Sequence, residues 1–196
     1  EFAGYGGLNA NEMKALLADS NIYSVGSHSS FDVFENSFEQ ELAFHQAIGS
    51  KYIICPGFHM HTLEDIERVA KALNSASEKA KKVGITVGYH NHAYEFETID
   101  GEYILDRLAK ATNDDVILEL DVYWVQYADV DPIEYIKKWG KKIGLIHLKQ
   151  IGPEKANVDM PDGFIDMKKI IETAKYATHF IVEQENSVRP RMESVK

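Results

Sequence analysis

Short apolar runs alternate with helix-like segments along the whole chain, and this alternation constrains the fold more than any other feature. Between the runs, the apolar positions recur at helical spacing, as in Ile66, Val69 and Leu73, which follow the N-cap candidate Thr62. Parallel strands that are covered by helices are typically short and apolar in this way. We therefore expect an α/β fold with parallel strands. The expected strands are residues 22–28, 52–55, 85–92, 116–122, 143–149 and 180–185.

The repeat length favours a closed barrel over an open sheet. One strand and one helix recur about every 25 to 35 residues, which is typical of a (β/α)₈ barrel, or TIM barrel, of about 250 residues. If residues 1–4 are also a strand, the pattern predicts a TIM barrel that lacks its first strand and its last helix, with residues 1–196 as a single domain. A doubly wound sheet is the alternative. No Gly-x-Gly-x-x-Gly or Walker-type loop follows any expected strand, which argues against it.

Composition limits the partners of the protein. The 31 acidic residues outnumber the 21 basic ones, for a net charge of −10, and no run of Lys or Arg occurs. This balance argues against nucleic acid as a partner. No segment has the roughly 18 consecutive apolar residues that cross a bilayer, so we expect no membrane partner. A homo-oligomer is compatible with this composition.

The sequence contains few clues to the cellular compartment. The single cysteine, Cys55, lies in an apolar run and fits a reducing compartment. We therefore expect a cytoplasmic protein. The first residues, Glu1–Tyr5, are typical of the end of a strand and include no initiator methionine. A periplasmic location consequently stays open.

Ionisable side chains stand near the ends of four successive expected strands. They are His90, Asp121, His147 and Glu183, and each is about one strand–helix repeat from the next. In a barrel, the C-terminal ends of the strands meet at one face, where the chemistry takes place. The sequence thus brings two imidazoles and two carboxylates toward one space.

A divalent metal is the simplest explanation for such a group of charges. Charges in a half-buried space repel one another and lose hydration unless a cation compensates them. Mixed nitrogen and oxygen ligands suit zinc, manganese, cobalt or iron better than calcium, and magnesium is a further candidate. Alternatively, each residue alone could be a strand-end side chain bonded to a loop backbone.

Four motifs carry a family resemblance that extends over nearly the whole chain. They are Tyr89-His90-Asn91-His92, Leu120-Asp121-Val122-Tyr123-Trp124, His147-Leu148-Lys149 and Ile181-Val182-Glu183-Gln184. With these motifs the chain resembles the xylose isomerase-like superfamily of TIM barrels. That superfamily includes sugar phosphate isomerases and epimerases, inosose dehydratases and metal-dependent AP endonucleases.

The resemblance implies a ligand set for the metal. In the superfamily, Glu, Asp, His and Glu on four successive strands hold it, and Asp121, His147 and Glu183 match the last three positions. The first position differs, because His90 stands where many members have glutamate. We assign His90 as the ligand there, with His92 as the fallback. Since ketose epimerases of the family use that glutamate in acid–base catalysis, this change favours the dehydratase-like branches.

Three residues are candidates for catalysis. His92 could be the general base, or a hydrogen-bond partner of the site. Glu183 is the alternative base. Lys149 could stabilise an enolate oxygen, or it could form an ion pair with Glu119 or Glu185.

Four further residues are candidates for substrate binding. His28 and His59 follow expected strands and could contact sugar hydroxyls. Trp124 could wall the pocket, although aromatic side chains after strands are often plain packing. Glu185, two residues beyond Glu183, is the fourth candidate.

Together, these features predict a divalent-metal-dependent sugar isomerase or epimerase. It would act on a small carbohydrate, a keto-sugar or polyol, through an enediolate. A keto-sugar dehydratase or lyase with the same metal site is the main alternative. An AP endonuclease-like phosphodiesterase is disfavoured by the negative charge and by Trp124, which stands where the endonucleases carry a further histidine. A non-catalytic sugar-binding barrel is the other alternative.

Overall fold

The chain forms two compact units in its computed structural model, which describes residues 1–195 apart from the side chain of residue 191. Unit 1 comprises Glu1–His90 and Ile99–Ile117, and unit 2 comprises Asn91–Thr98 and Leu118–Lys196. The strand β6 (Val116–Asp121) begins in unit 1 and ends in unit 2. The expectation that residues 1–196 form a single domain stays a prediction.

Unit 1 consists of parallel strands and the helices between them. Strand β2 pairs in parallel with both β1 and β3, with Ser27 opposite Ile53 and Ile53 opposite Val87. Residue Phe2 adds a parallel bridge to Ser27. The elements of this unit are α1 (Ala10–Asp19), β1 (Gly26–His28), α2 (Phe31–Asn36), α3 (Phe38–Ile48), β2 (Tyr52–Cys55), α4 (Leu63–Lys81), β3 (Thr86–His90), β5 (Glu102–Tyr103) and α5 (Ile104–Ala111).

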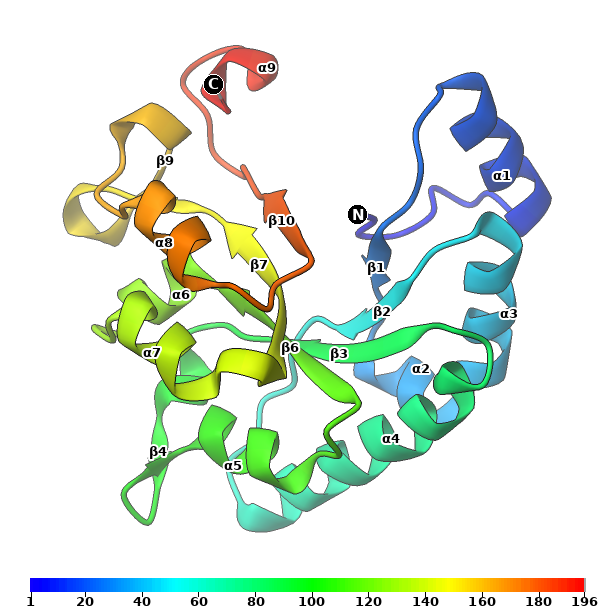
Figure 1. Ribbon diagram of the computed structural model, residues 1–196, viewed down its shortest axis with the longest axis horizontal. Helices are drawn as coiled ribbons and strands as arrows, with labels where there is room; N and C mark the ends of the chain where they lie inside the picture. Colours follow the sequence, from blue (N-terminus) through cyan, green and yellow to red (C-terminus); the bar gives the residue numbers. More distant parts are fainter. Residues whose placement is uncertain (196) are drawn as a thin grey trace. The chain divides into compact units, whose positions relative to one another are not determined.

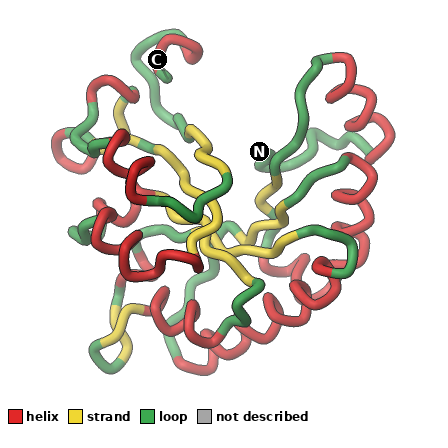
Figure 2. The backbone as a smooth tube through the Cα atoms, in the orientation of Figure 1, coloured by secondary structure: helices red, strands yellow, loops and turns green. Residues whose placement is uncertain are grey.

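The long helix α4 covers the strands of unit 1. It begins with a capping box, in which Thr62 and Asp65 bond each other's backbone N–H groups. Its apolar face, including Val69 and Leu73, is completely buried, and α4 runs alongside β3 (Figure 1). In Figure 2, the helices α2, α3 and α4 lie outside the strands that they connect. The core of unit 1 is therefore the layer between these helices and the sheet.

Unit 2 has the same construction. Its central strand β7 is buried along its whole length and pairs in parallel with both β6 and β10. The helices α7 and α8 pack against each other beside these strands (Figure 1). The elements are η1 (Tyr94–Phe96), α6 (Val122–Tyr127), α7 (Pro132–Trp139), η2 (Gly140–Lys142), β7 (Ile143–Leu148), β8 (Gln150–Ile151), η3 (Pro153–Lys155), β9 (Asn157–Val158), η4 (Met160–Asp162), α8 (Met167–Thr173), β10 (His179–Val182) and α9 (Arg191–Ser194); β4 (Thr98–Ile99) adjoins both units.

Three expected strands are shorter by two or more residues than the apolar pattern predicts. The run 22–28 forms a strand only over Gly26–His28. The run 85–92 forms a strand only over Thr86–His90, so His92 lies beyond its end. The run 180–185 corresponds to β10, which ends at Val182, so Glu183 is the first residue after it. Among residues 1–195, no helix is long and apolar enough to cross a membrane.

Candidate functional site

A bulge between β6 and β7 aligns the candidate residues of unit 2. Leu118 lies opposite Ile143, but Glu119 lies opposite Leu145, so the pairing skips Gly144. Without this shift, the side chain of Asp121 would share a face with Ile146 rather than with His147. With the shift, Asp121 lies directly opposite His147. The bulge therefore re-aims an acidic side chain toward the imidazole, which is a common use of bulges near sites.

Strand β10 brings Glu183 to the same place. Ile181 lies opposite His147, and the backbone N–H of Glu183 bonds the Leu148 carbonyl at 3.1 Å. Since side chains alternate along a strand, Ile181 and Glu183 point the same way, as do His147 and Lys149. One ligand atom from each of Asp121, His147 and Glu183 consequently lies within 4.8 Å of the others.

The carboxylate of Asp121 is held by the helix that it starts. Its Oδ1 accepts hydrogen bonds from the backbone N–H groups of Tyr123, at 2.8 Å, and Trp124, at 3.2 Å. The side chain of Asn91 also accepts the Asp121 backbone N–H, at 3.0 Å. The first two bonds orient the buried carboxylate so that Oδ1 caps the short helix α6, and the third holds the Asp121 backbone.

Each nitrogen of the His147 ring has a carboxylate oxygen close to it. Nδ1 donates to Glu183 Oε2 at 2.7 Å, and Nε2 lies 3.4 Å from Glu119 Oε1. Glu119 is completely buried and His147 nearly so. The carboxylates of Asp121 and Glu183 and the imidazole of His147 form a nitrogen and oxygen donor set that is able to hold a divalent cation.

Lys149 is a completely buried lysine beside this set. Its Nζ bonds Glu183 at 2.8 Å and Glu185 at 2.9 Å. It also lies 5.1 Å from the ring centre of Trp124 and 5.2 Å from that of Tyr123. Burial lowers the pKa of Lys149, but the two carboxylates outweigh it and raise this pKa overall. The lysine is therefore charged and forms two cation–π contacts.

Glu183 is ionised despite its burial. Burial raises the pKa of Glu183, but the hydrogen bonds from His147 and Lys149 and the positive charge of both residues outweigh it. The result is a pKa far below the usual range of a glutamate. Glu183 thus presents a permanent negative charge to the other donors.

His92 lies in a loop rather than on a strand. Its backbone N–H donates to the buried carboxylate of Glu95 at 2.7 Å. Its ring stacks on Tyr94, whose hydroxyl lies 3.3 Å from Nδ1, and it contacts Trp124 with ring centres 5.3 Å apart. The expected strand 85–92 would place His92 on the same face as His90 by strand alternation, but β3 ends at His90, so this alternation does not extend to His92.

The other predicted residues belong to unit 1. His90 is buried at the end of β3, and its ring lies 4.9 Å from that of His28. The Nε2 atom of His28 is 3.4 Å from a Glu1 carboxylate oxygen. His59 is exposed in the loop after β2, with its ring 6.1 Å from that of His61. The roles assigned to His28, His59 and His90 stay predictions.

Sequence reasoning missed the roles of three residues. The sequence indicates Glu119 only as a possible ion-pair partner of Lys149, but in the structure its carboxylate contacts His147. Glu119 lies two residues before Asp121 on the same strand, and this spacing indicates that both side chains point to the same face. Asn91 and Glu95 support Asp121 and His92 through backbone bonds. No sequence pattern indicates such bonds, because they join positions that only the loop geometry brings together.

One family model matches almost the whole chain. The model of the xylose isomerase-like TIM barrel family matches residues 3–196. An inosose dehydratase from Clostridium botulinum (strain Eklund 17B / Type B) is 26% identical over 163 residues, covering 74% of this chain and 54% of that protein. One from Clostridium perfringens (strain 13 / Type A) is 23% identical over 193 residues, covering 79% of this chain and 64% of that protein. The chain thus spans between 54% and 64% of these curated relatives.

Solved structures show the same fold at low identity. A sugar phosphate isomerase/epimerase from Parabacteroides distasonis ATCC 8503 superposes with a TM-score of 0.84 at 24% identity, over 99% of this chain and 75% of that one. The apo 3-keto-D-glucoside 4-epimerase from E. coli superposes with a TM-score of 0.71 at 14% identity, over 95% and 81% of the two chains. At these identities the likeness concerns the fold alone.

Proposed function

The chain belongs to the xylose isomerase-like TIM barrel family, and we propose that it is a divalent-metal-dependent enzyme acting on a keto-sugar or polyol. The reaction would be an isomerisation or epimerisation through an enediolate. One observation carries the proposal: Asp121, His147 and Glu183, at the ends of neighbouring strands, have ligand atoms within 4.8 Å of one another.

The metal would be held by Asp121, His147 and Glu183, with His90 as the fourth ligand and His92 as the fallback. The chemistry of the donors supports this assignment. A proton now joins His147 Nδ1 to Glu183 across 2.7 Å, and metal binding to such groups releases protons. Manganese, zinc, cobalt and magnesium are the candidates. A bound divalent ion would supply Lewis acidity that polarises a substrate carbonyl and acidifies the adjacent C–H.

His92 is the proposed base for that C–H. Imidazoles suit proton transfer near neutral pH, and His92 is oriented by Tyr94 and Trp124 on its ring and by Glu95 on its backbone. Glu183 is the alternative, but its low pKa makes it a weak proton acceptor. Lys149 would donate a hydrogen bond to the oxygen on which negative charge develops.

Proton abstraction leads to different products depending on the next step. Return of the proton to the neighbouring carbon is isomerisation, and return to the opposite face is epimerisation. Loss of a β-hydroxyl is dehydration. Dehydration is the second candidate function, because the curated relatives are inosose dehydratases that align with 74% or more of this chain in the two cases above.

Solvent exchange at the α carbon tests the proposal. We expect the protein, loaded with Mn²⁺, to catalyse deuterium incorporation from D₂O into at least one member of a panel of keto-sugars and inososes. Asp121→Asn should lower the exchange rate about 100-fold and the metal affinity at least about 10-fold. Asparagine can still cap α6, so the variant removes the charge without removing the cap.

Asp131→Asn is the matched control. Asp131 caps α7 in the same unit by accepting the Ile133 and Glu134 backbone N–H groups, so this variant should retain full exchange and metal affinity. Exchange with no panel member, or equal exchange in Asp121→Asn, refutes the proposal. Several bound metals with phosphodiesterase activity would favour the endonuclease alternative, and sugar binding without any retained metal would favour a non-catalytic barrel.

A further inference from the structure

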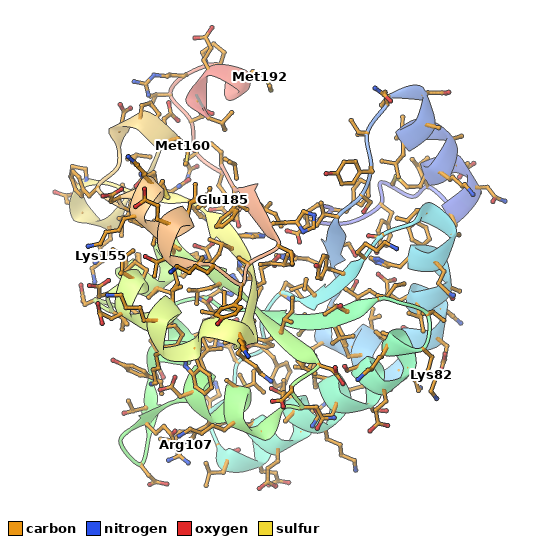
Figure 3. The ribbon with its side chains drawn as sticks, viewed as in Figure 1. Lys82, Arg107, Lys155, Met160, Glu185 and Met192 are labelled. Carbon is orange, nitrogen blue, oxygen red and sulfur yellow. The ribbon has the colours of Figure 1, made fainter. Side chains whose placement is uncertain are left out.

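Unit 2 contains a cavity that is not lined by any of the proposed catalytic residues His92, Lys149 and Glu183. Its volume is about 380 Å³, within the range of small-molecule pockets. Two segments form its walls, the β9–η4 region and the chain after β10. Figure 3 labels one residue from each region, Met160 and Glu185, and shows both in the upper part of unit 2. The lining residues are Asn157, Val158, Asp159, Asp162, Glu185, Asn186, Ser187 and Val188.

Hydrogen bonds hold the two walls together. Arg189, on the second wall, donates to Asp159 at 3.0 Å and to Asp162 at 3.0 Å, on the first. Asn157 accepts the Asn186 backbone N–H at 3.2 Å. Asp159 is almost completely buried, so the Arg189 contact there is shielded from water. These contacts link the two walls of the cavity.

The cavity is connected to the proposed catalytic groups through Glu185. This residue lines the cavity, and its carboxylate bonds Lys149 at 2.9 Å. Lys149 in turn bonds Glu183 at 2.8 Å. Glu185 therefore belongs both to the cavity wall and to the ion pairs of Lys149, which places the cavity next to these charged groups.

The charges of the cavity exclude a phosphate group. None of its eight lining residues, all described by the structure, is basic. The guanidinium of Arg189 is already shared by Asp159 and Asp162, and its hydrogen bond lowers the pKa of Asp162, which is ionised at neutral pH. A phosphate ester, with a charge of about −1.5 to −2, would meet carboxylates here. Hydroxyl groups, by contrast, donate to carboxylates and pair with amides.

We infer that this cavity is a subsite for an uncharged, hydroxyl-bearing extension of the substrate, such as a second sugar ring. The inference rests on the proposed function and narrows it: the substrate is a neutral keto-glycoside or a similar extended polyol, and it is not a sugar phosphate. The amide of Asn186, the hydroxyl of Ser187 and the carboxylate of Glu185 supply hydrogen-bonding partners for the added hydroxyls.

Matched ketoses test this subsite. The probes are fructose, its neutral 6-O-glycoside isomaltulose, its 4-O-glycoside lactulose, and fructose 6-phosphate. Affinities are measured by ligand-observed NMR titration on the Mn²⁺-free protein, and α-carbon exchange is measured on the loaded protein. We expect isomaltulose or lactulose to bind at least about 10-fold more tightly than fructose, and fructose 6-phosphate to bind more weakly than either disaccharide.

Asn186→Trp fills the cavity from an exposed position without touching the backbone groups that link its walls. It should lower the ratio of disaccharide to fructose affinity about 10-fold. Lys168→Trp is the control, because Lys168 lies on the exposed face of α8 with 86% of its side chain accessible; the ratio should stay the same.

Several outcomes overturn the subsite. They are tighter binding of fructose 6-phosphate, no gain from either glycosyl group, and an unchanged ratio in Asn186→Trp. These outcomes are separate from failure of the proposed function. Absence of exchange with every ketose would refute the chemistry, while the binding ratios would still decide whether the cavity accepts a neutral sugar ring.

Discussion

Replacing Lys149 with methionine tests the charge balance of unit 2. Methionine keeps most of the apolar stem, which can still pack on Tyr123 and Trp124, but it removes the ammonium group. Glu183 and Glu185 then lose a cation at 2.8 and 2.9 Å. Breaking a buried pair by removing one partner costs about 3–5 kcal/mol. Glu183 is 26% exposed and Glu185 57%, so water compensates part of the loss, and we expect a cost of about 2 kcal/mol.

Urea unfolding of the metal-free protein measures this cost. The dependence of the cost on pH shows whether it comes from the Lys149–Glu183 ion pair. The folded-state pKa of Glu183 is lowered from 4.5 and that of Lys149 is raised from 10.5. The ion pair of Lys149 and Glu183 therefore stabilises the folded state between about pH 4.5 and pH 10.5, where both groups are charged. The difference between wild type and Lys149→Met should be constant near neutral pH, shrink as the pH falls below about 4.5, and shrink again above about 10.5.

A double-mutant cycle with Glu183→Gln isolates the pair. The two substitutions together should cost less than the sum of the single ones, by about 1 kcal/mol. Lys155→Met is the control, because Lys155 and its partner Asp129 are 40% and 80% exposed; its cost should stay within about 0.5 kcal/mol. If Lys149→Met costs no more than this control, or if the cycle shows no coupling, the reasoning about Lys149 is refuted.

Two substitutions in unit 1 test packing and hydrogen bonding. Tyr5→Phe removes a hydroxyl that donates to Glu41 and contacts His45 at 2.9 Å, so the free energy of unfolding in urea should fall by about 1–3 kcal/mol; an unchanged midpoint contradicts this. Gly88→Ala would place a Cβ 2.6 Å from Ile54 Cδ1 and 3.2 Å from the Ile117 carbonyl oxygen. Since that backbone oxygen cannot move easily, overpacking should cost about 1–3 kcal/mol, and a stabilised variant would refute it.

The order of elements could be predicted from the sequence because local signals mark them. Thr62 is the N-cap of α4 as expected, and β2 has the predicted bounds. The α/β TIM barrel class is confirmed by the family match, and the doubly wound alternative is wrong. Local signals failed for α6, which directly follows β6. Its apolar sequence from Val122 onward continues that of the strand, so periodicity could not locate the change.

The candidate site was predictable in its residue types but not in its register. Strand ends could be aligned from the repeat, which correctly brought Asp121, His147 and Glu183 together in unit 2. The bulge at Gly144 was not predicted, although an isolated glycine inside an apolar strand often marks one. Simple alternation would have turned Asp121 away from His147. The proximity of Asp121, His147 and Glu183 was predicted from position along the strands and not from register, and their roles stay predictions.

The charges of unit 2 support the proposed cation site. Glu119, Asp121 and Glu183 surround His147, and the first two are completely buried. Lys149 is the buried cation beside them, but its ammonium is shared between Glu183 and Glu185. One lysine cannot balance all these carboxylates, and uncompensated buried charge is costly. With Glu185 there are four carboxylates against one ammonium, so a divalent ion would offset two of the remaining three charges. On this view, Lys149→Met should increase the dependence of folding on metal, so that adding Mn²⁺ raises the unfolding midpoint of the variant more than that of the wild type.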